Sequence, residues 1–244
     1  GASALRKALG DMSESFAVVD AISDEALLTI GEAVDGAALV TGGSGIALGL
    51  PRNFIRAGRA QGGETPFAPV KGAAAILAGS CSGATRGQVE HHAACHPTLA
   101  IDVPGVMAGT FTADDVVRFV TEHAGQAPLV YSSGTPEQVG AMQSEFGREV
   151  VSARLDALFA DTARALIAQG YRRLVVAGGE TSGAVAQAVC DTLSVDAMRI
   201  GPEIDPGVPI LSLGDAPVLL ALKSGNFGTP DFFDKALAIM EQGA

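Results

Sequence analysis

One stretch decides the fold: Leu174-Val175-Val176-Ala177-Gly178-Gly179-Glu180-Thr181-Ser182-Gly183-Ala184-Val185. Its first four residues are apolar and predict a buried strand, and a helical pattern follows the glycines. Gly178 and Gly179 predict a tight turn, because glycine adopts backbone angles closed to other residues and lets a ligand approach the main chain. Thr181 or Ser182 can cap the helix. A helix N-terminus at this place would attract an anion, phosphate above all, although a plain strand-to-helix connection is the alternative.

The composition favours an α/β protein and argues against several partners. The chain has 244 residues, of which 48% are hydrophobic and 31 are glycine, as expected where parallel strands alternate with closely packed helices. A net charge of −11 argues against nucleic acid, which requires a cationic face. Neither a membrane-spanning run nor a signal peptide is visible, so we expect a cytoplasmic protein with no membrane partner. The three widely spaced cysteines predict free thiols.

The N-terminal quarter predicts part of a domain. Residues 16–20 and 37–40 are expected as short strands, with helices near 24–33 and 46–50. So small a sheet buries too little surface to stand alone, so the chain is expected to start inside a domain. We therefore predict three parts: the C-terminal portion of one domain (1–60), a linker (61–72) and a second, complete domain (73–244).

The second domain is expected to hold mostly parallel sheets flanked by helices. The pattern predicts strands at 74–78, 98–101, 128–131, 174–177 and 217–222, and helices at 85–94, 112–123, 148–169, 182–193 and 231–240. A further helix is expected to start at Pro136. Two prolines in residues 201–207 predict a stiff loop between short apolar segments at 197–200 and 209–211.

Three predicted strands are followed by glycine- and hydroxyl-containing turns, at residues 79–85, 178–183 and 223–228. Because the carboxyl ends of parallel strands meet at one edge of a sheet, these turns can converge on one crevice. They would supply backbone N–H groups, hydroxyls and the cation of Lys223 to a phosphate, and Glu180 or Asp205 could hold Mg²⁺. The alternative is that such turns accumulate in any glycine-rich α/β protein and that Lys223 is a surface residue.

Other motifs are absent or incomplete. Neither GxxxxGK[ST] nor GxGxxG occurs, so a P-loop nucleotidase and a dinucleotide fold are not supported. The run Gly42-Gly43-Ser44-Gly45 has Ile46 where a nucleophile elbow needs glycine, which disfavours a serine hydrolase. The cluster His91, His92, Cys95 and His96 places His92 and His96 on one helix face, but it lacks a second ligand pair at zinc-like spacing, so a polar helix end is the favoured interpretation.

Four segments in this order resemble the four-carbon acid sugar kinase family: Gly79-Ser80-Cys81-Ser82, Ala177-Gly178-Gly179-Glu180-Thr181-Ser182-Gly183, Gly201-Pro202-Glu203-Ile204-Asp205-Pro206-Gly207-Val208-Pro209 and Leu222-Lys223-Ser224-Gly225-Asn226-Phe227-Gly228. In that family an N-terminal domain binds a four-carbon sugar acid and a C-terminal domain binds ATP, which phosphorylates the acid. Residues 18–21 and 41–45 resemble the end of the first domain. The family's early Asp-Asp-x-Thr-Gly motif has no counterpart.

The resemblance implies a set of site residues and cofactors. By the resemblance, ATP with Mg²⁺ would contact Ser80 or Ser82, the turn of Gly178, Gly179, Glu180 and Thr181, and Gly225. Lys223 and Asn226, from the third turn, complete the predicted cofactor-binding set. The acceptor would be threonate, erythronate or 3-oxo-tetronate. The catalytic base stays unassigned, with Asp20 a candidate because a carboxylate at a strand end often faces a cleft.

Several alternatives stay open. Without the Asp-Asp-x-Thr-Gly motif, the chain by itself is expected to be inactive. One alternative is a non-catalytic nucleotide-binding or type III effector-like interaction module, and another is a different α/β enzyme acting on a phosphorylated metabolite. A homodimer is also compatible with the sequence.

Overall fold

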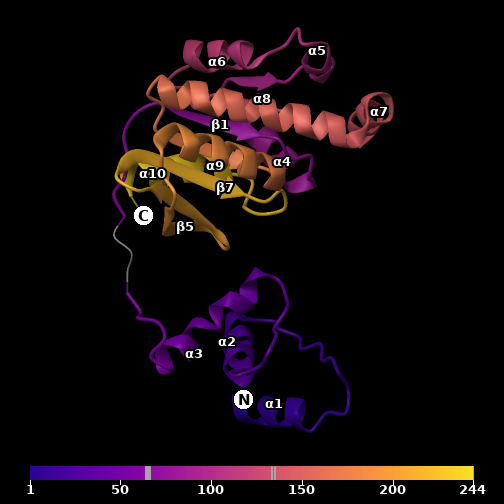
Figure 1. Ribbon diagram of the computed structural model, residues 1–244, viewed down its shortest axis with the longest axis vertical. Coiled ribbons are helices and arrows are strands. Elements are labelled where there is room, and N and C mark those ends of the chain that lie inside the picture. The colour runs from indigo at the N-terminus through magenta and orange to yellow at the C-terminus, as the bar shows by residue number, and fades with distance from the viewer. Residues whose placement is uncertain (64–66, 133, 135, 244) are drawn as a thin grey trace. The chain divides into compact units, whose positions relative to one another are not determined.

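The computed structural model describes residues 1–63, 67–132, 134 and 136–243, which fall into two compact units. Unit 1 comprises residues 1–64 and unit 2 residues 65–244 (Figure 1). Assignment of these units to a substrate domain and a nucleotide domain stays a prediction. Among the helices that the structure describes, none is long and apolar enough to cross a membrane.

Unit 1 is built from helices and irregular chain. It contains the helices α1 (Ala2–Gly10), α2 (Asp24–Ala33), the 3-10 helix η1 (Ser44–Leu48) and α3 (Pro51–Arg56). The helix predicted near 24–33 is confirmed, and Ser23 caps it by accepting a hydrogen bond from the Ala26 N–H.

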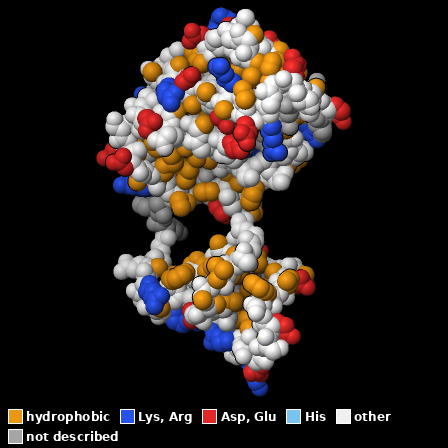
Figure 2. Space-filling model, turned by 45° about the vertical axis from the view of Figure 1, so that its right-hand side comes forward, with side chains coloured by type: hydrophobic (Ala, Val, Ile, Leu, Met, Phe, Trp, Pro, Cys, Tyr) orange, Lys and Arg blue, Asp and Glu red, His pale blue; other side chains and the backbone are white. Residues whose placement is uncertain are grey.

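The two strands predicted in unit 1 are wrong. Residues 16–20 and 37–40 form no strand, and Phe16 and Val18 are 90% and 97% exposed. A strand is stable only when a neighbouring strand satisfies its backbone groups, and residues 1–63 contain no partner strand. Apolar side chains consequently gather on the surface of this unit (Figure 2). Asp20 is an exposed residue of this irregular chain, so the strand-end argument for it as a base fails.

Unit 2 holds a mostly parallel sheet, as predicted. Its described strands are β1 (Ala74–Ala78), β2 (Thr98–Ala100), β3 (Leu129–Tyr131), β4 (Arg173–Ala177), β5 (Met198–Asp205), β6 (Val208–Leu213) and β7 (Ala216–Lys223). They lie in the order β2-β3-β1-β4-β7-β6-β5. The first five in this order run parallel, and β6 pairs antiparallel with both β7 and β5.

Helices cover both faces of the sheet (Figure 1). They are α4 (Gly83–Ala93), α5 (Val103–Ala108), α6 (Ala113–Glu122), α7 (Pro136–Phe146), α8 (Arg148–Ala168), α9 (Gly179–Leu193) and α10 (Phe232–Gln242). Alternation along β1 divides the core: Ala75 and Leu77 pack with α5, α6, α8 and α9, whereas Ile76 and Ala78 pack with α4 and α10. Because both faces are buried at the centre of the sheet, β1 is a continuous apolar run, as is β4 after Arg173.

The segment 201–207, predicted as a loop, is mostly strand. It forms the end of β5 and a hairpin turn at Pro206 and Gly207, where Gly207 has a φ of +82°. Pro202 is tolerated because β5 is an edge strand with register shifts between Ile200 and Asp205. Proline therefore marks an irregular sheet edge here.

Candidate nucleotide site

The three predicted turns converge. They follow β1, β4 and β7, which are adjacent parallel strands, so all three leave the same edge of the sheet. The Gly79 N–H donates to the Ala177 carbonyl at 2.8 Å, and the Gly178 N–H donates to the Lys223 carbonyl at 2.9 Å. The Ser82 hydroxyl donates to the Gly225 carbonyl, which joins the first turn to the third. Hydrogen bonds thus connect all three turns.

Glycines make this close approach possible. A Cβ atom on Gly79 would lie 2.1 Å from Oγ1 of Thr181, and one on Gly225 would lie 2.3 Å from Oγ of Ser80. Gly178 has a φ of +130°, a conformation that side chains rarely adopt. At Gly179 the situation is reversed, because an added Cβ would meet nothing within 4 Å. Gly179 therefore borders open space.

That open space is part of a cavity of about 830 Å³ at the carboxyl ends of β1, β3 and β4. The helix α9 begins at its wall, with Gly178 as the N-cap. The first N–H groups of a helix have no partner within the helix, so α9 presents donors and a positive dipole end there. Five predicted ATP contacts line the cavity, and they are Ser80, Gly178, Gly179, Glu180 and Thr181.

The other predicted contacts do not line this cavity. Ser82 caps α4 by accepting from the Thr85 N–H at 3.2 Å, and Gly225 and Asn226 belong to the turn after β7. Lys223 is 1% exposed, so the alternative of a surface lysine is wrong. Its Nζ donates to Thr85 Oγ1 at 2.9 Å and to the carbonyls of Ser224 and Gly225, each at 3.2 Å. Burial lowers the pKa of Lys223 to about 8.

The two predicted magnesium ligands do not share a site. Glu180 lines the cavity and accepts a hydrogen bond from the Ser152 hydroxyl at 2.9 Å. Asp205 does not line it, and its carboxylate is held by Lys235 Nζ and by the N–H and hydroxyl of Thr229. Of these two predicted ligands, only Glu180 therefore lines the cavity.

Sequence reasoning missed two residues of α8. Arg148, the first residue of that helix, lines the cavity and supplies a cation there. Asp156 accepts from Thr181 Oγ1 at 3.2 Å and so fixes a residue of the second turn. Burial, followed by the nearby Glu180, raises the pKa of Asp156 despite the hydrogen bonds from Thr181 and Ser152. The available signal was the position of Asp156 between the apolar residues Leu155 and Ala157 of a predicted helix.

The histidine cluster is not simply the polar helix end that the sequence favoured. His92 is buried beneath α10, where Asp234 lies 2.8 Å from its Nδ1 atom, and His91 and Cys95 are exposed. The polar helix end expected here is therefore wrong for His92. The three cysteines are free.

The fold and the cavity define an α/β domain in which strand ends and a helix N-terminus meet at a cavity, an arrangement that suits an anionic ligand. Residues 75–233 match the model of the family described as "Nucleotide-binding C-terminal domain". The chain belongs to this nucleotide-binding family, and the names of its relatives support the four-carbon acid sugar kinase family that the sequence predicted.

Known relatives are similar along most of the chain. A protein of Cupriavidus necator named 3-oxo-tetronate kinase is 49% identical over 226 residues, which are 91% of this chain and 51% of the relative. A protein of Salmonella typhimurium with the same name is 37% identical, covering 97% of this chain and 57% of the relative. The chain thus spans about half the length of the curated relatives it matches.

Solved structures agree in fold. A crystal structure from Salmonella typhimurium superposes with a TM-score of 0.73 at 36% identity, covering 97% of this chain and 56% of that one. Another, from Haemophilus influenzae, gives a TM-score of 0.70 at 34% identity, covering 98% of this chain and 58% of that one.

Proposed function

We propose that this chain is the nucleotide-binding part of an ATP-dependent kinase that phosphorylates a four-carbon sugar acid of the 3-oxo-tetronate, threonate or erythronate type. The observation that carries the proposal is the cavity at the N-terminus of α9, with Gly179 open toward it. The names of the relatives favour 3-oxo-tetronate among the three acids. The proposed location is the cytoplasm, and sedimentation would test whether the protein is a homodimer.

The residues of the cavity suit the charges of ATP. The N–H groups at the start of α9 would donate to phosphate oxygens, and Arg148 would neutralise part of their charge. Oxygen ligands suit Mg²⁺, so Glu180 would hold the ion directly or through water. The ion would neutralise phosphate charge during transfer. Lys223 would act indirectly, since it holds the turn after β7 in place.

We expect this chain to bind ATP without phosphorylating a sugar acid by itself. The relatives named 3-oxo-tetronate kinase are nearly twice as long as the matched region, and the sequence has no Asp-Asp-x-Thr-Gly motif. The sugar acid would accordingly be bound by residues of a longer protein.

Binding of Mg-ATP tests the proposal. The wild-type chain should melt at a higher temperature with millimolar Mg-ATP, since a ligand at 100 times its Kd adds about 2.7 kcal/mol to the free energy of unfolding. The substitution Gly179→Asp should remove that rise, because its carboxylate would occupy the open space and repel phosphate. Gly183→Asp is the matched control, because Gly183 is exposed in the same helix and does not line the cavity.

Each alternative has its own outcome. A wild-type melting curve that millimolar nucleotide leaves unchanged would count against the kinase. ATP binding without transfer to any of the three acids, measured on a chain as long as the relatives, would favour a non-catalytic module. A rise in melting temperature with a sugar phosphate but not with ATP would favour a different α/β enzyme.

A further inference from the structure

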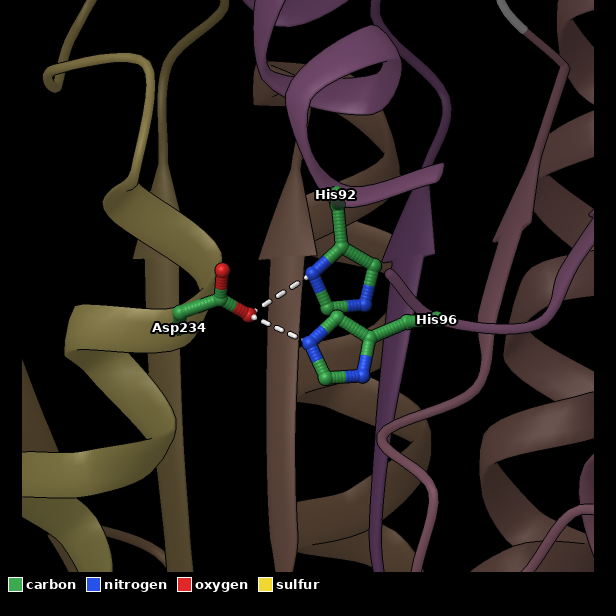
Figure 3. Close-up of side chains that lie close together, drawn as sticks. All are labelled: His92, His96 and Asp234. Carbon is green, nitrogen blue, oxygen red and sulfur yellow. Dashed lines mark ion pairs between the residues drawn. The ribbon is translucent and has the colours of Figure 1, made fainter. Parts of the chain in front are cut away.

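Two histidines and an aspartate meet away from the cavity. His92 lies near the end of α4, His96 lies one turn beyond it, and Asp234 comes from the first turn of α10 (Figure 3). The Asp234 Oδ1 atom is 2.8 Å from Nδ1 of His92 and 3.4 Å from Nε2 of His96. Three atoms that can each bind a metal, one from each residue, lie within 4.8 Å of one another.

Backbone carbonyls fix which ring nitrogens carry hydrogen. Nε2 of His92 lies 2.8 Å from the carbonyl oxygen of Ala127, and Nδ1 of His96 lies 3.1 Å from that of Gln126. A carbonyl can only accept a hydrogen bond, so each of these nitrogens is the donor. In a neutral imidazole the other nitrogen then carries a lone pair. Both lone pairs, on Nδ1 of His92 and Nε2 of His96, belong to the atoms nearest Asp234.

The two ring nitrogens with lone pairs and the Asp234 Oδ1 atom lie close together, so they repel one another unless a positive charge is bound between them. Nδ1 of His92 is buried, and within the described part of the chain its near neighbour is the Asp234 carboxylate, 2.8 Å away, which has no hydrogen to donate when it is ionised. The two rings are stacked with centroids 4.2 Å apart, so adding a proton to each would place two cations in contact.

We propose that His92 Nδ1, His96 Nε2 and the Asp234 carboxylate bind one divalent transition-metal ion, for which Zn²⁺ is the best fit. Two imidazoles and one carboxylate form a common zinc ligand set, with water in a fourth position. Ligand atoms around one tetrahedral Zn²⁺ stand about 3.3 Å apart, close to the separations of 2.8 and 3.4 Å. The carbonyls of Ala127 and Gln126 orient the rings, as outer partners of metal-bound histidines usually do.

The site would join the C-terminal end of α4 to the first turn of α10. Its two nearest ligands in the sequence, His96 and Asp234, are 138 residues apart. The carbonyls of Gln126 and Ala127 precede β3, whereas the cavity is lined by residues that follow it, such as Ser132. His96 and Asp234 are 31% and 41% exposed, which gives an ion access from solvent. The ion would therefore hold α4 and α10 together as a structural metal site, and this site is separate from the cavity proposed for the nucleotide.

Metal uptake by the whole chain tests the inference. After treatment with a chelator, the protein should bind one Zn²⁺ per chain and melt at a higher temperature, and Co²⁺ should give the visible absorption of a tetrahedral site. His96→Gln and Asp234→Asn should each weaken Zn²⁺ affinity at least tenfold. Both residues are partly exposed, so these variants are expected to fold, whereas His92→Gln alters a buried side chain. His91→Gln and Cys95→Ser are controls on exposed neighbours and should leave affinity unchanged.

Three results would overturn it. The first is wild-type protein that takes up no stoichiometric Zn²⁺ or Co²⁺. The second is Zn²⁺ binding that survives His96→Gln and Asp234→Asn but is lost in His91→Gln or Cys95→Ser. The third is a nitrogen NMR spectrum in which His92 carries protons on both ring nitrogens while added Zn²⁺ changes nothing.

Discussion

Lys223 is buried at the end of β7, where Thr85 Oγ1 and two carbonyls of the following turn accept from its ammonium. No acidic side chain pairs with it among the described ion pairs. Burial of the charge therefore lowers the pKa to about 8. The residue braces the third turn, at a cost in free energy while it is charged.

The stability contribution of Lys223 should depend on pH. Between about pH 8 and 10.5 the folded state loses this proton while the unfolded state keeps it, so stability rises with pH. Relative to Lys223→Met, the wild-type free energy of unfolding should rise by on the order of 3 kcal/mol at most across this range. Urea unfolding at several pH values measures the difference. Lys235→Met is the control. The hydrogen bond to Asp205 raises the pKa of Lys235, so the contribution of Lys235 to the free energy of unfolding is lost only above this pH range.

Arg148 at the cavity wall is expected to contribute to nucleotide binding. Its position at the cavity wall means that Arg148→Gln should weaken Mg-ATP binding by about ten- to a hundredfold, since a hydrogen bond between charged groups contributes about 1.5–3 kcal/mol. Calorimetric titration measures the Kd. Arg154→Gln, an exposed position on the same helix that does not line the cavity, should leave the Kd unchanged. Equal losses in both variants would refute a specific role for Arg148.

At the scale of elements, the β5–β6 hairpin is attached to α10 through Asp205. Its carboxylate is 8% exposed and accepts from Lys235 and from Thr229. Burial tends to raise the pKa of Asp205, but these hydrogen bonds outweigh it, and the pKa lies below its ordinary value. The hairpin and α10 are thus coupled by a charge-assisted network.

Removal of that charge should loosen the hairpin. Asp205→Asn should lower the free energy of unfolding at pH 7 by about 1–3 kcal/mol, because it replaces charged hydrogen bonds. Since the folded pKa is depressed, the wild-type advantage is present above about pH 4 and is lost as pH falls through the folded pKa. Denaturant unfolding at pH 7 and pH 3 measures it. Asp215→Asn, exposed in the next turn, should show little change, and an equal loss there would contradict the assignment.

At the scale of the whole molecule, unit 2 contains a complete sheet with a core on each face. Residues 67–244 expressed alone should therefore unfold cooperatively, and their Kd for Mg-ATP should stay within about twofold of the full chain. Circular dichroism and calorimetry measure the two properties. Aggregation of the segment, or loss of ATP binding on removal of residues 1–66, would show that unit 2 depends on unit 1.

The local sequence pattern was sufficient to predict most strands of unit 2, but it predicted two strands in unit 1 that do not form. Continuous apolar runs such as 74–78 and 174–177 become strands because neighbouring strands satisfy their backbone groups. Residues 16–20 carry a similar pattern but have no partner, and they stay irregular. In β5, tertiary pairing with β6 overrode the prolines that predicted a loop.

The sequence by itself determined the family, the parallel α/β class and the convergence of three glycine turns on one sheet edge. These features follow from short-range rules, because strand ends and helix starts are marked by adjacent residues. Only the tertiary structure decided that Lys223 is buried, that Arg148 reaches the cavity and that Asp234 faces His92 and His96. Each depends on contacts between residues far apart in the chain, which folding establishes and sequence spacing does not encode.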